Sequence, residues 1–331
     1  MARIAQENLL ELCAILGFTI ASKSEPQDVA LRGLNPSMNS LGVQLDFPAP
    51  RSGQHVLTAS LPPDKRTKYI AQTLKVSKQA TLRKSEAESI TGRAVYVSSA
   101  IWGRVARAYE HPFRKIAEGL PVRRSEWHRA ARSLAEFYAN ASPRHILPLA
   151  ASRPHAVIAT DARGNPAGEW ASEHLGGICF WNHTARWFSD TIQAGLFVAF
   201  SDSSAISDAQ HRINIAEALA ALVALVYWRQ ELAGHQVILL IDNMAAEGTL
   251  QRGYSPDVDL CRITNRFWQI CNAYDIILWV DRVPSAYNIA DPLSRGDFSD
   301  MKLLDCTRSE SHKTGRVDFE YLVDRRHSTR T

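Results

Sequence analysis

The spacing of hydrophobic positions along the chain changes near residue 150. Before that point, apolar residues recur every three to four positions, which predicts amphipathic helices over Lys65–Val76, Ser85–Ala108 and Ser125–Ala141. Ser85 with Glu88 three residues later predicts a capping box for the second helix. The first half of the chain is therefore expected to be mainly helical.

After residue 150, short apolar runs bounded by turn residues alternate with helical patterns, which predicts an α/β fold with a mixed sheet and flanking helices. The helix expected over Ile215–Leu232 is apolar nearly all round, as a helix buried against a sheet would be. The expected strands are His155–Asp161, Gly176–Trp181, Ala185–Ser189, Gln236–Ile241 and Asp275–Val283, and the other expected helices are Asn243–Gln251, Asp257–Asn272 and one starting within Ile289–Leu293.

These patterns divide the chain into four expected regions. Residues 1–50 read as a small mixed unit with extended pieces at Gly17–Ala21 and Leu41–Phe47. Residues 51–150 form a basic helical region, and residues 151–298 form the α/β domain. Residues 299–331 are a polar C-terminal tail.

The formal net charge of +4 hides an uneven distribution. Residues 51–150 hold 18 basic and 7 acidic side chains, a density that attracts phosphate groups, although a solvated helical surface that binds nothing explains it equally well. No apolar run reaches the ~20 residues of a membrane-spanning helix. Because the five cysteines show no CxxC spacing, we expect reduced thiols in an intracellular protein, cytoplasmic or nuclear, with no membrane partner.

Four acidic residues of the second half lie next to apolar segments: Asp161, Glu217, Asp242 and Asp291. Taken singly, each has an ordinary structural explanation as a turn residue, a helix cap or a first-turn charge. Taken together, carboxylates that end neighbouring strands and face one helix would repel one another unless divalent cations neutralised them. Oxygen ligands suit Mg²⁺ or Mn²⁺, and a pair of such ions catalyses phosphodiester hydrolysis.

The segments around these carboxylates resemble the ribonuclease H domain of retrotransposon reverse transcriptases. The resemblance is carried by Thr160-Asp161-Ala162-Arg163-Gly164, Gly176-Gly177, Asn214-Ile215-Ala216-Glu217, Ile241-Asp242-Asn243 and Asn288-Ile289-Ala290-Asp291-Pro292-Leu293-Ser294-Arg295. It covers residues 155–297 and implies a ribonuclease H-like fold that cleaves the RNA strand of RNA·DNA hybrids.

The resemblance also implies a role for each carboxylate. Asp161 and Asp242 would hold both of two Mg²⁺ ions, Glu217 the first and Asp291 the second. Many relatives carry a histidine shortly before the last aspartate, whereas this chain has Ser285-Ala286-Tyr287 there. The departure concerns product release rather than the metal site.

The start of the chain resembles the end of the polymerase palm in the same proteins, through Leu16-Gly17-Phe18-Thr19-Ile20-Ala21-Ser22-Lys23 and Leu41-Gly42-Val43-Gln44-Leu45-Asp46. Ser85–Ile116 resembles the thumb or connection helices. The resemblance implies that Lys23 lies beside the incoming nucleotide, although an ordinary surface lysine is an equally good interpretation. The Tyr-x-Asp-Asp signature is absent from the sequence. We therefore expect the C-terminal part of a reverse transcriptase, without polymerase activity of its own and with a separate palm chain as a possible partner.

Polar side chains close to the carboxylates in sequence are candidates for binding the hybrid: Asn243, Asn214, Gln210 and Arg295, with polar caps or surface positions as the alternative for each amide. Trp181 and Trp187 could flank the nucleic acid, although tryptophans on strands more often belong to the core. The leading hypothesis is a metal-dependent endonuclease. The alternatives are a catalytically silent nucleic-acid-binding relic and a different nuclease on the same fold.

Overall fold

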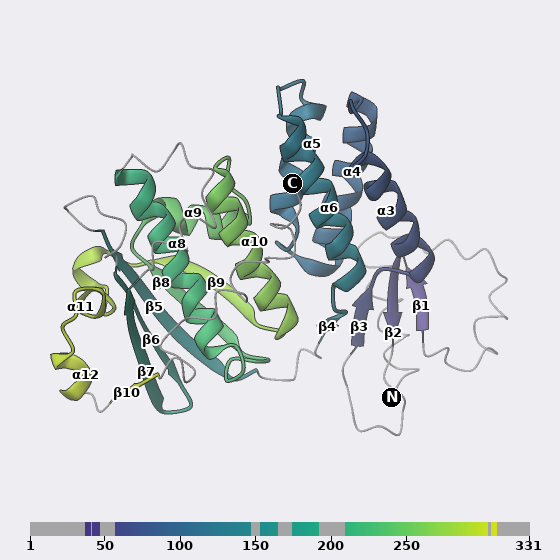
Figure 1. Cartoon of the computed structure of the whole chain (residues 1–331). Coiled ribbons are helices and arrows are strands. Elements are labelled where there is room, and N and C mark those ends of the chain that lie inside the picture. The colour runs from purple at the N-terminus through teal and green to yellow at the C-terminus, as the bar shows by residue number, and fades with distance from the viewer. Residues whose placement is uncertain are drawn as a thin grey trace, which may run out of the picture. The chain divides into compact units, whose positions relative to one another are not determined.

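The computed structural model describes residues 37–40, 42–46, 57–146, 153–164, 174–191, 209–303 and 306–309 (Figure 1). Its contacts divide the chain into two compact units, Met1–Pro62 with Pro143–Ala151 and Pro63–Ser142 with Ser152–Thr331. The four regions expected from the sequence stay a prediction, but the helices of the basic region share a unit with the α/β domain. Among the described residues, no helix is both long and apolar enough to span a bilayer.

The first unit contains a small antiparallel sheet. Its strands follow the order β1 (Ser37–Ser40), β2 (Val43–Asp46), β3 (Leu57–Ser60) and β4 (Arg144–Ile146). The extended segment predicted near Leu41–Phe47 corresponds to β2. Pairing of β3 with β4 brings together residues more than eighty positions apart, a long-range contact that sequence periodicity does not reveal.

Four helices connect β3 to β4: α3 (Pro63–Val76), α4 (Lys84–Val97), α5 (Arg107–Ala117) and α6 (Arg124–Asn140). The predicted capping box at Ser85 is wrong, because the backbone N–H of Arg83 donates to the carboxylate of Glu86 (3.1 Å) and the helix begins one residue earlier. The predicted helix through Ala108 is also wrong. It ends at Val97 in a π-helical turn, and Gly103 has a φ of +67°, which breaks the helical path.

The α/β domain has a six-stranded mixed sheet with the order β10-β7-β6-β5-β8-β9. The pairs β5–β6 and β6–β7 are antiparallel, and the remaining pairs are parallel. The strands are β5 (His155–Arg163), β6 (His174–Trp181), β7 (Thr184–Thr191), β8 (Gln236–Ile241), β9 (Ile277–Arg282) and β10 (Thr307–Arg308). The predicted fold class, a mixed sheet with flanking helices, is confirmed. Strand β10, within the expected tail, was not predicted.

Helices cover both faces of this sheet (Figure 1). One face packs against α8 (Ala209–Trp228) and α9 (Met244–Arg252), and α10 (Val258–Ala273) packs against these two helices. As predicted, α8 is buried on nearly all sides from Ile215 to Val226. The other face is covered by α11 (Asp291–Ser294) and α12 (Ser299–Leu303). Strand β8 alternates buried and exposed positions, and Ile238 is 46% exposed.

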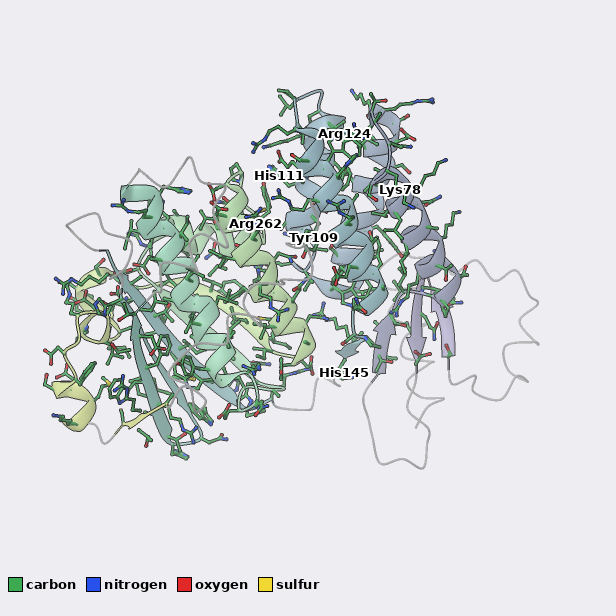
Figure 2. All side chains as sticks on the ribbon, viewed as in Figure 1. Lys78, Tyr109, His111, Arg124, His145 and Arg262 are labelled. Atoms are coloured by element: carbon green, nitrogen blue, oxygen red, sulfur yellow. The ribbon has the colours of Figure 1, made fainter. Side chains whose placement is uncertain are left out.

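Helix α5 of the basic region packs against α10 of the α/β domain. The Tyr109 hydroxyl accepts hydrogen bonds from Asn265 and Gln269, and the guanidinium of Arg104 lies 5.0 Å from the centre of the Trp268 ring. Figure 2 shows Tyr109 on α5 beside α10, and the ring of His111 stacks on Tyr254. The basic helices are therefore attached to the domain that carries the four conspicuous carboxylates.

Gly176 permits a close approach between β6 and α11. A Cβ at this position would lie 2.5 Å from the backbone nitrogen of Ser294 and 2.9 Å from the carbonyl oxygen of Ala290. We expect Gly176→Ala to destabilise the protein by about 1–3 kcal/mol, because backbone atoms cannot yield as a flexible side chain can. Urea unfolding measures the loss.

Gly92→Ala is the matched control for this prediction. Gly92 lies within α4, and nothing lies within 4 Å of the position of its added Cβ. This substitution should stabilise the protein by about 0.5–1 kcal/mol, because alanine favours a helix. Equal effects of the two substitutions would contradict the close approach at Gly176.

Candidate metal centre

Three of the four predicted carboxylates converge at one edge of the mixed sheet. Asp161 lies near the end of β5, and Asp242 directly follows β8. These strands are parallel neighbours, so their carboxyl ends reach the same edge, and α8 packs across β5 with Glu217 in its first half. One oxygen from each carboxylate lies within 4.8 Å of the other two. The structure thus brings Asp161, Glu217 and Asp242 together.

Asp161 is held in place by the loop and helix that cover its face of the sheet. The Ser294 hydroxyl donates to one carboxylate oxygen, and the Asn288 side-chain amide donates to the other (3.3 Å) and to the carbonyl oxygen of Thr160 (3.1 Å). The Asn288 side-chain oxygen accepts from the backbone N–H of Ala290 (3.2 Å), which fixes the orientation of the amide. These bonds orient a carboxylate that is only 5% exposed.

Glu217 is the most confined carboxylate of the three. It is 4% exposed, and the backbone N–H of Ala162 donates to it. Its Oε2 atom is buried without a hydrogen-bond partner in the described structure. A buried carboxylate oxygen without a donor is costly, and a cation held jointly with Asp161 and Asp242 would satisfy it.

The electrostatics of the cluster favour a bound cation. Burial raises the pKa of Asp161 to about 6, and the charges of Asp242 and Asp291 add to this effect against the lowering effect of the Ser294 hydrogen bond. Burial, then Asp161 and Asp242, raises the pKa of Glu217 well above its usual value. Carboxylates that disfavour one another's ionisation in this way are relieved by a divalent cation. Three carboxylates suit a hard cation such as Mg²⁺ or Mn²⁺.

Asp291, the fourth predicted ligand, lies near the cluster but is paired with a cation of its own helix. Its two oxygens accept from Arg295 Nε (2.7 Å) and Nη2 (2.8 Å). Its charge contributes to raising the pKa of both Asp161 and Glu217, which places it within electrostatic range of the site. Its role as a ligand stays a prediction. Arg295 forms this bidentate ion pair with a side chain that is 57% exposed, and its contact with nucleic acid stays a prediction.

The polar residues predicted beside the carboxylates are only partly described. Asn243 caps α9, because its side-chain oxygen accepts from the N–H groups of Ala245 and Ala246 at 2.9 Å, as the structural alternative predicted. Its side-chain amide donates to Asn214 on α8 (3.0 Å), so the two amides lie together beside the site. The side chain of Gln210 and all of Lys23 lie outside the described residues.

Trp187 belongs to the core. It is 7% exposed, its ring stacks on Phe298, and its indole N–H donates to the carbonyl oxygen of Cys306. Trp181 is half-buried, with the guanidinium of Arg186 5.6 Å from its ring centre. These contacts favour a structural role for Trp187 in the core rather than a role in stacking on nucleic acid.

Asn288 and Ser294 were quoted in the sequence motif but not singled out as site residues. Both bond Asp161 across more than 120 positions of sequence, a separation at which no local pattern links donor to acceptor. The only feature of the sequence that links them to the site is their position on either side of Asp291. We conclude that the segment from 288 to 295 supplies hydrogen-bond donors to Asp161 as well as a carboxylate.

Removing the Ser294 hydroxyl should make metal binding more sensitive to acid. The hydrogen bond from Ser294 lowers the pKa of Asp161, so Ser294→Ala should raise that pKa further above about 6, by about one pH unit for a hydrogen bond worth about 1.4 kcal/mol. A metal ion competes with this proton, so the pH at which Mn²⁺ affinity falls should move upward by the same amount. Calorimetric titrations across the range from about pH 5 to about pH 8 measure this change. An unmoved profile would argue against the bond.

No family model and no curated protein matches this sequence. Among solved structures, the RNase H1 of the halophilic archaeon Halobacterium salinarum is 23% identical, with a TM-score of 0.32, over 45% of this chain and 99% of that one. The N-terminal RNase H domain of a Mycobacterium tuberculosis protein, solved as a fusion with maltose binding protein, is 16% identical, with a TM-score of 0.30, over 46% of this chain and 99% of that one.

Proposed function

We propose that this protein is a metal-dependent endonuclease that cleaves the RNA strand of RNA·DNA hybrids. The observation that carries the proposal is the meeting of Asp161, Glu217 and Asp242 within 4.8 Å, with a Glu217 oxygen that has no partner in the described structure. The site has oxygen ligands only and lies at the end of a parallel strand pair, where substrates of α/β proteins commonly bind.

In this proposal Asp161, Glu217 and Asp242 hold the cation, which is Mg²⁺ with Mn²⁺ as a substitute, and Asp291 takes part in holding a second ion. When bound, two such ions activate water and stabilise the leaving oxygen of a phosphodiester. The chain's own contribution is orientation. Ser294 and Asn288 fix the carboxylate of Asp161 so that it does not have to reorganise when the cation binds.

The hybrid would be recognised by shape and backbone rather than by base sequence. The paired amides of Asn214 and Asn243 lie beside the carboxylates and can exchange hydrogen bonds with ribose 2′-hydroxyls. Exposed cations on the basic helices and in the turns beside them would attract the phosphates beyond the cleavage site: Lys68, Lys75, Lys78, Arg83, Lys84, Arg123, Arg124 and Arg132. Figure 2 labels Lys78 and Arg124 in this region.

The sequence motifs further support a retroelement context, in which this chain supplies the ribonuclease H part of a reverse transcriptase and works beside a separate palm chain. An intracellular location, in the cytoplasm or nucleus, agrees with the free thiols of the described cysteines, Cys179, Cys261, Cys271 and Cys306.

The test is cleavage of a hybrid whose RNA and DNA strands carry different labels. We expect the purified chain to cut only the RNA strand, to require Mg²⁺ or Mn²⁺, and to leave an RNA duplex and a DNA duplex of the same sequence intact. A protein that binds the hybrid but leaves it uncut with either metal would be the catalytically silent relic. Cleavage of the DNA duplex would instead indicate a different nuclease on this fold.

A further inference from the structure

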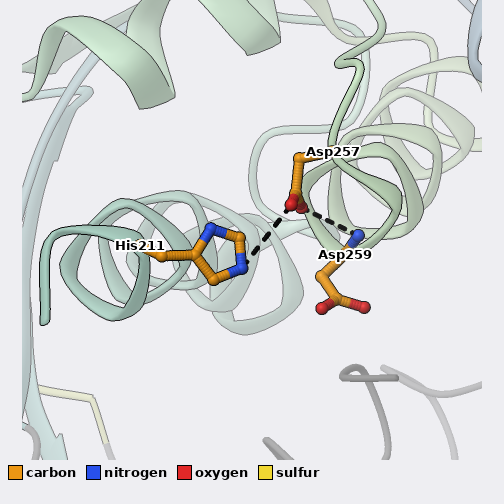
Figure 3. Close-up of side chains that lie close together, drawn as sticks. All are labelled: His211, Asp257 and Asp259. Atoms are coloured by element: carbon orange, nitrogen blue, oxygen red, sulfur yellow. Dashed lines mark hydrogen bonds and ion pairs between the residues drawn. The ribbon is translucent and has the colours of Figure 1, made fainter. Parts of the chain in front are cut away.

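A second group of metal-ligating side chains lies where the first turn of α8 meets the start of α10. His211 comes from α8, and Asp257 and Asp259 come from the cap and first turn of α10 (Figure 3). One ligand atom of each residue lies within 4.8 Å of the other two. Asp161, Glu217 and Asp242 form a separate group, so this cluster has no ligand in common with the candidate metal centre.

The two carboxylate oxygens of Asp257 have different neighbours. Its Oδ1 atom accepts from the N–H groups of Asp259 and Leu260, both at 2.9 Å, and thereby caps α10. Its Oδ2 atom faces His211 Nε2 at 3.5 Å. Figure 3 shows the imidazole of His211 directed from its helix toward the two aspartates. The cap thus leaves one oxygen of Asp257 for His211 or for a shared ligand.

The His211 Nε2 atom has no satisfactory partner. It exposes less than 1 Å² and makes no hydrogen bond in the described structure, although the side chain as a whole is 17% exposed. The separation of 3.5 Å from Asp257 is longer than the roughly 2.7–2.9 Å of a charge-assisted hydrogen bond. An ion pair with Asp257 alone therefore leaves the nitrogen poorly satisfied, whereas a cation between the two would bind both.

The ligand types of the cluster also favour a cation. Asp259 is 5% exposed, and its Oδ1 atom accepts from Arg262 Nη1 at 3.5 Å. Imidazole nitrogen and carboxylate oxygen are both ligands of Zn²⁺, and three protein ligands leave the fourth tetrahedral position to water. Mg²⁺ prefers oxygen ligands alone, so the two clusters should select different metals.

We propose that His211, Asp257 and Asp259 form a zinc-binding site that fastens the beginning of α8 to the beginning of α10. The role of this site would be structural. Helix α8 carries Glu217 six residues beyond His211, and α10 packs against α5. A metal at this junction would fix the first turns of the helix from which Glu217 reaches the sheet edge. The proposal does not depend on nuclease activity.

Zinc titration of the metal-free full chain tests this site. With excess Mg²⁺ present to occupy the carboxylate centre, calorimetry should show one equivalent of Zn²⁺ bound, with an affinity at least tenfold weaker in His211→Gln. Asp257→Asn should also weaken binding while retaining the helix cap, since asparagine caps as well as aspartate. Asp161→Asn should leave the zinc affinity unchanged.

Equal zinc binding by the wild type and His211→Gln, or no stoichiometric binding by the wild type, would overturn the proposal. If His211→Gln does not fold, Asp259→Asn provides the same comparison. Loss of hybrid cleavage with zinc binding intact would count against the nuclease alone, so the two proposals fail separately.

Discussion

Asp242→Asn should abolish cleavage of the RNA strand, lowering kcat/KM by about a thousandfold or more. Asp242 follows β8 directly and shares the cluster with Asp161 and Glu217. The amide keeps the shape of the side chain but removes one of the charges that hold the cation, whose stabilisation of the transition state is worth several kcal/mol. About 4 kcal/mol corresponds to a thousandfold in rate. Multiple-turnover assays in saturating Mg²⁺ measure the loss.

The control for this substitution is Asp281→Asn. Asp281 is an exposed carboxylate of β9, on the same sheet and outside the cluster, so its loss should change cleavage less than about twofold. Hybrid binding by Asp242→Asn, measured in the absence of divalent ions, should stay close to that of the wild type. A variant that cleaves at the wild-type rate would remove Asp242 from the reaction.

Asp161→Asn should stabilise the metal-free protein by about 3 kcal/mol at about pH 8, where the carboxyl of the wild type is ionised in both states. The pKa of Asp161 rises from 3.8 to about 6 on folding, because burial and the neighbouring carboxylates disfavour its ionised form. The folded state therefore loses stability as the pH rises from 3.8 through about 6, by about 1.4 kcal/mol for each pH unit between these two values. Asparagine is neutral at every pH, so the variant does not lose this stability as the pH rises.

Urea unfolding in EDTA as a function of pH measures this effect. The advantage of Asp161→Asn should disappear toward about pH 4, near the pKa of the unfolded chain, because below it the wild-type carboxyl is protonated in both states. Mn²⁺ should reverse the ranking, since it stabilises only the protein that binds it. An asparagine variant less stable than the wild type in EDTA at high pH would mean that the hydrogen bonds of Asp161 outweigh its electrostatic cost.

The convergence of Asp161, Glu217 and Asp242 could be predicted only from the three carboxylates taken together, because each one alone has an ordinary structural explanation. Asp161 and Asp242 end apolar strands, and Glu217 lies in the first turns of a helix that is apolar nearly all round. Parallel strands that lie side by side bring their carboxyl ends to one edge of a sheet, which places the two aspartates together. The mixed sheet and the meeting of these carboxylates could therefore be predicted from the sequence, whereas the order of the strands was not predicted.

The contacts that tune the site were not accessible in this way. The bonds from Ser294 and Asn288 to Asp161, and the ion pair of Arg295 with Asp291, depend on how a short segment lies over the sheet. Strand β10 is two residues long and pairs with β7 across more than a hundred positions. Such features carry little periodicity, and the capping residue Arg83 is not among the types that signal a helix start.

The most direct test of the account is the location of the metal itself. Crystals of the full chain soaked in Mn²⁺ should show anomalous density at the edge of the sheet between Asp161, Glu217 and Asp242, with a carboxylate oxygen of each at about 2.0–2.3 Å. Glu217 Oε2 should be among the ligands. Manganese bound elsewhere, with these three carboxylates protonated and free of metal in a protein that still cleaves RNA, would contradict the account.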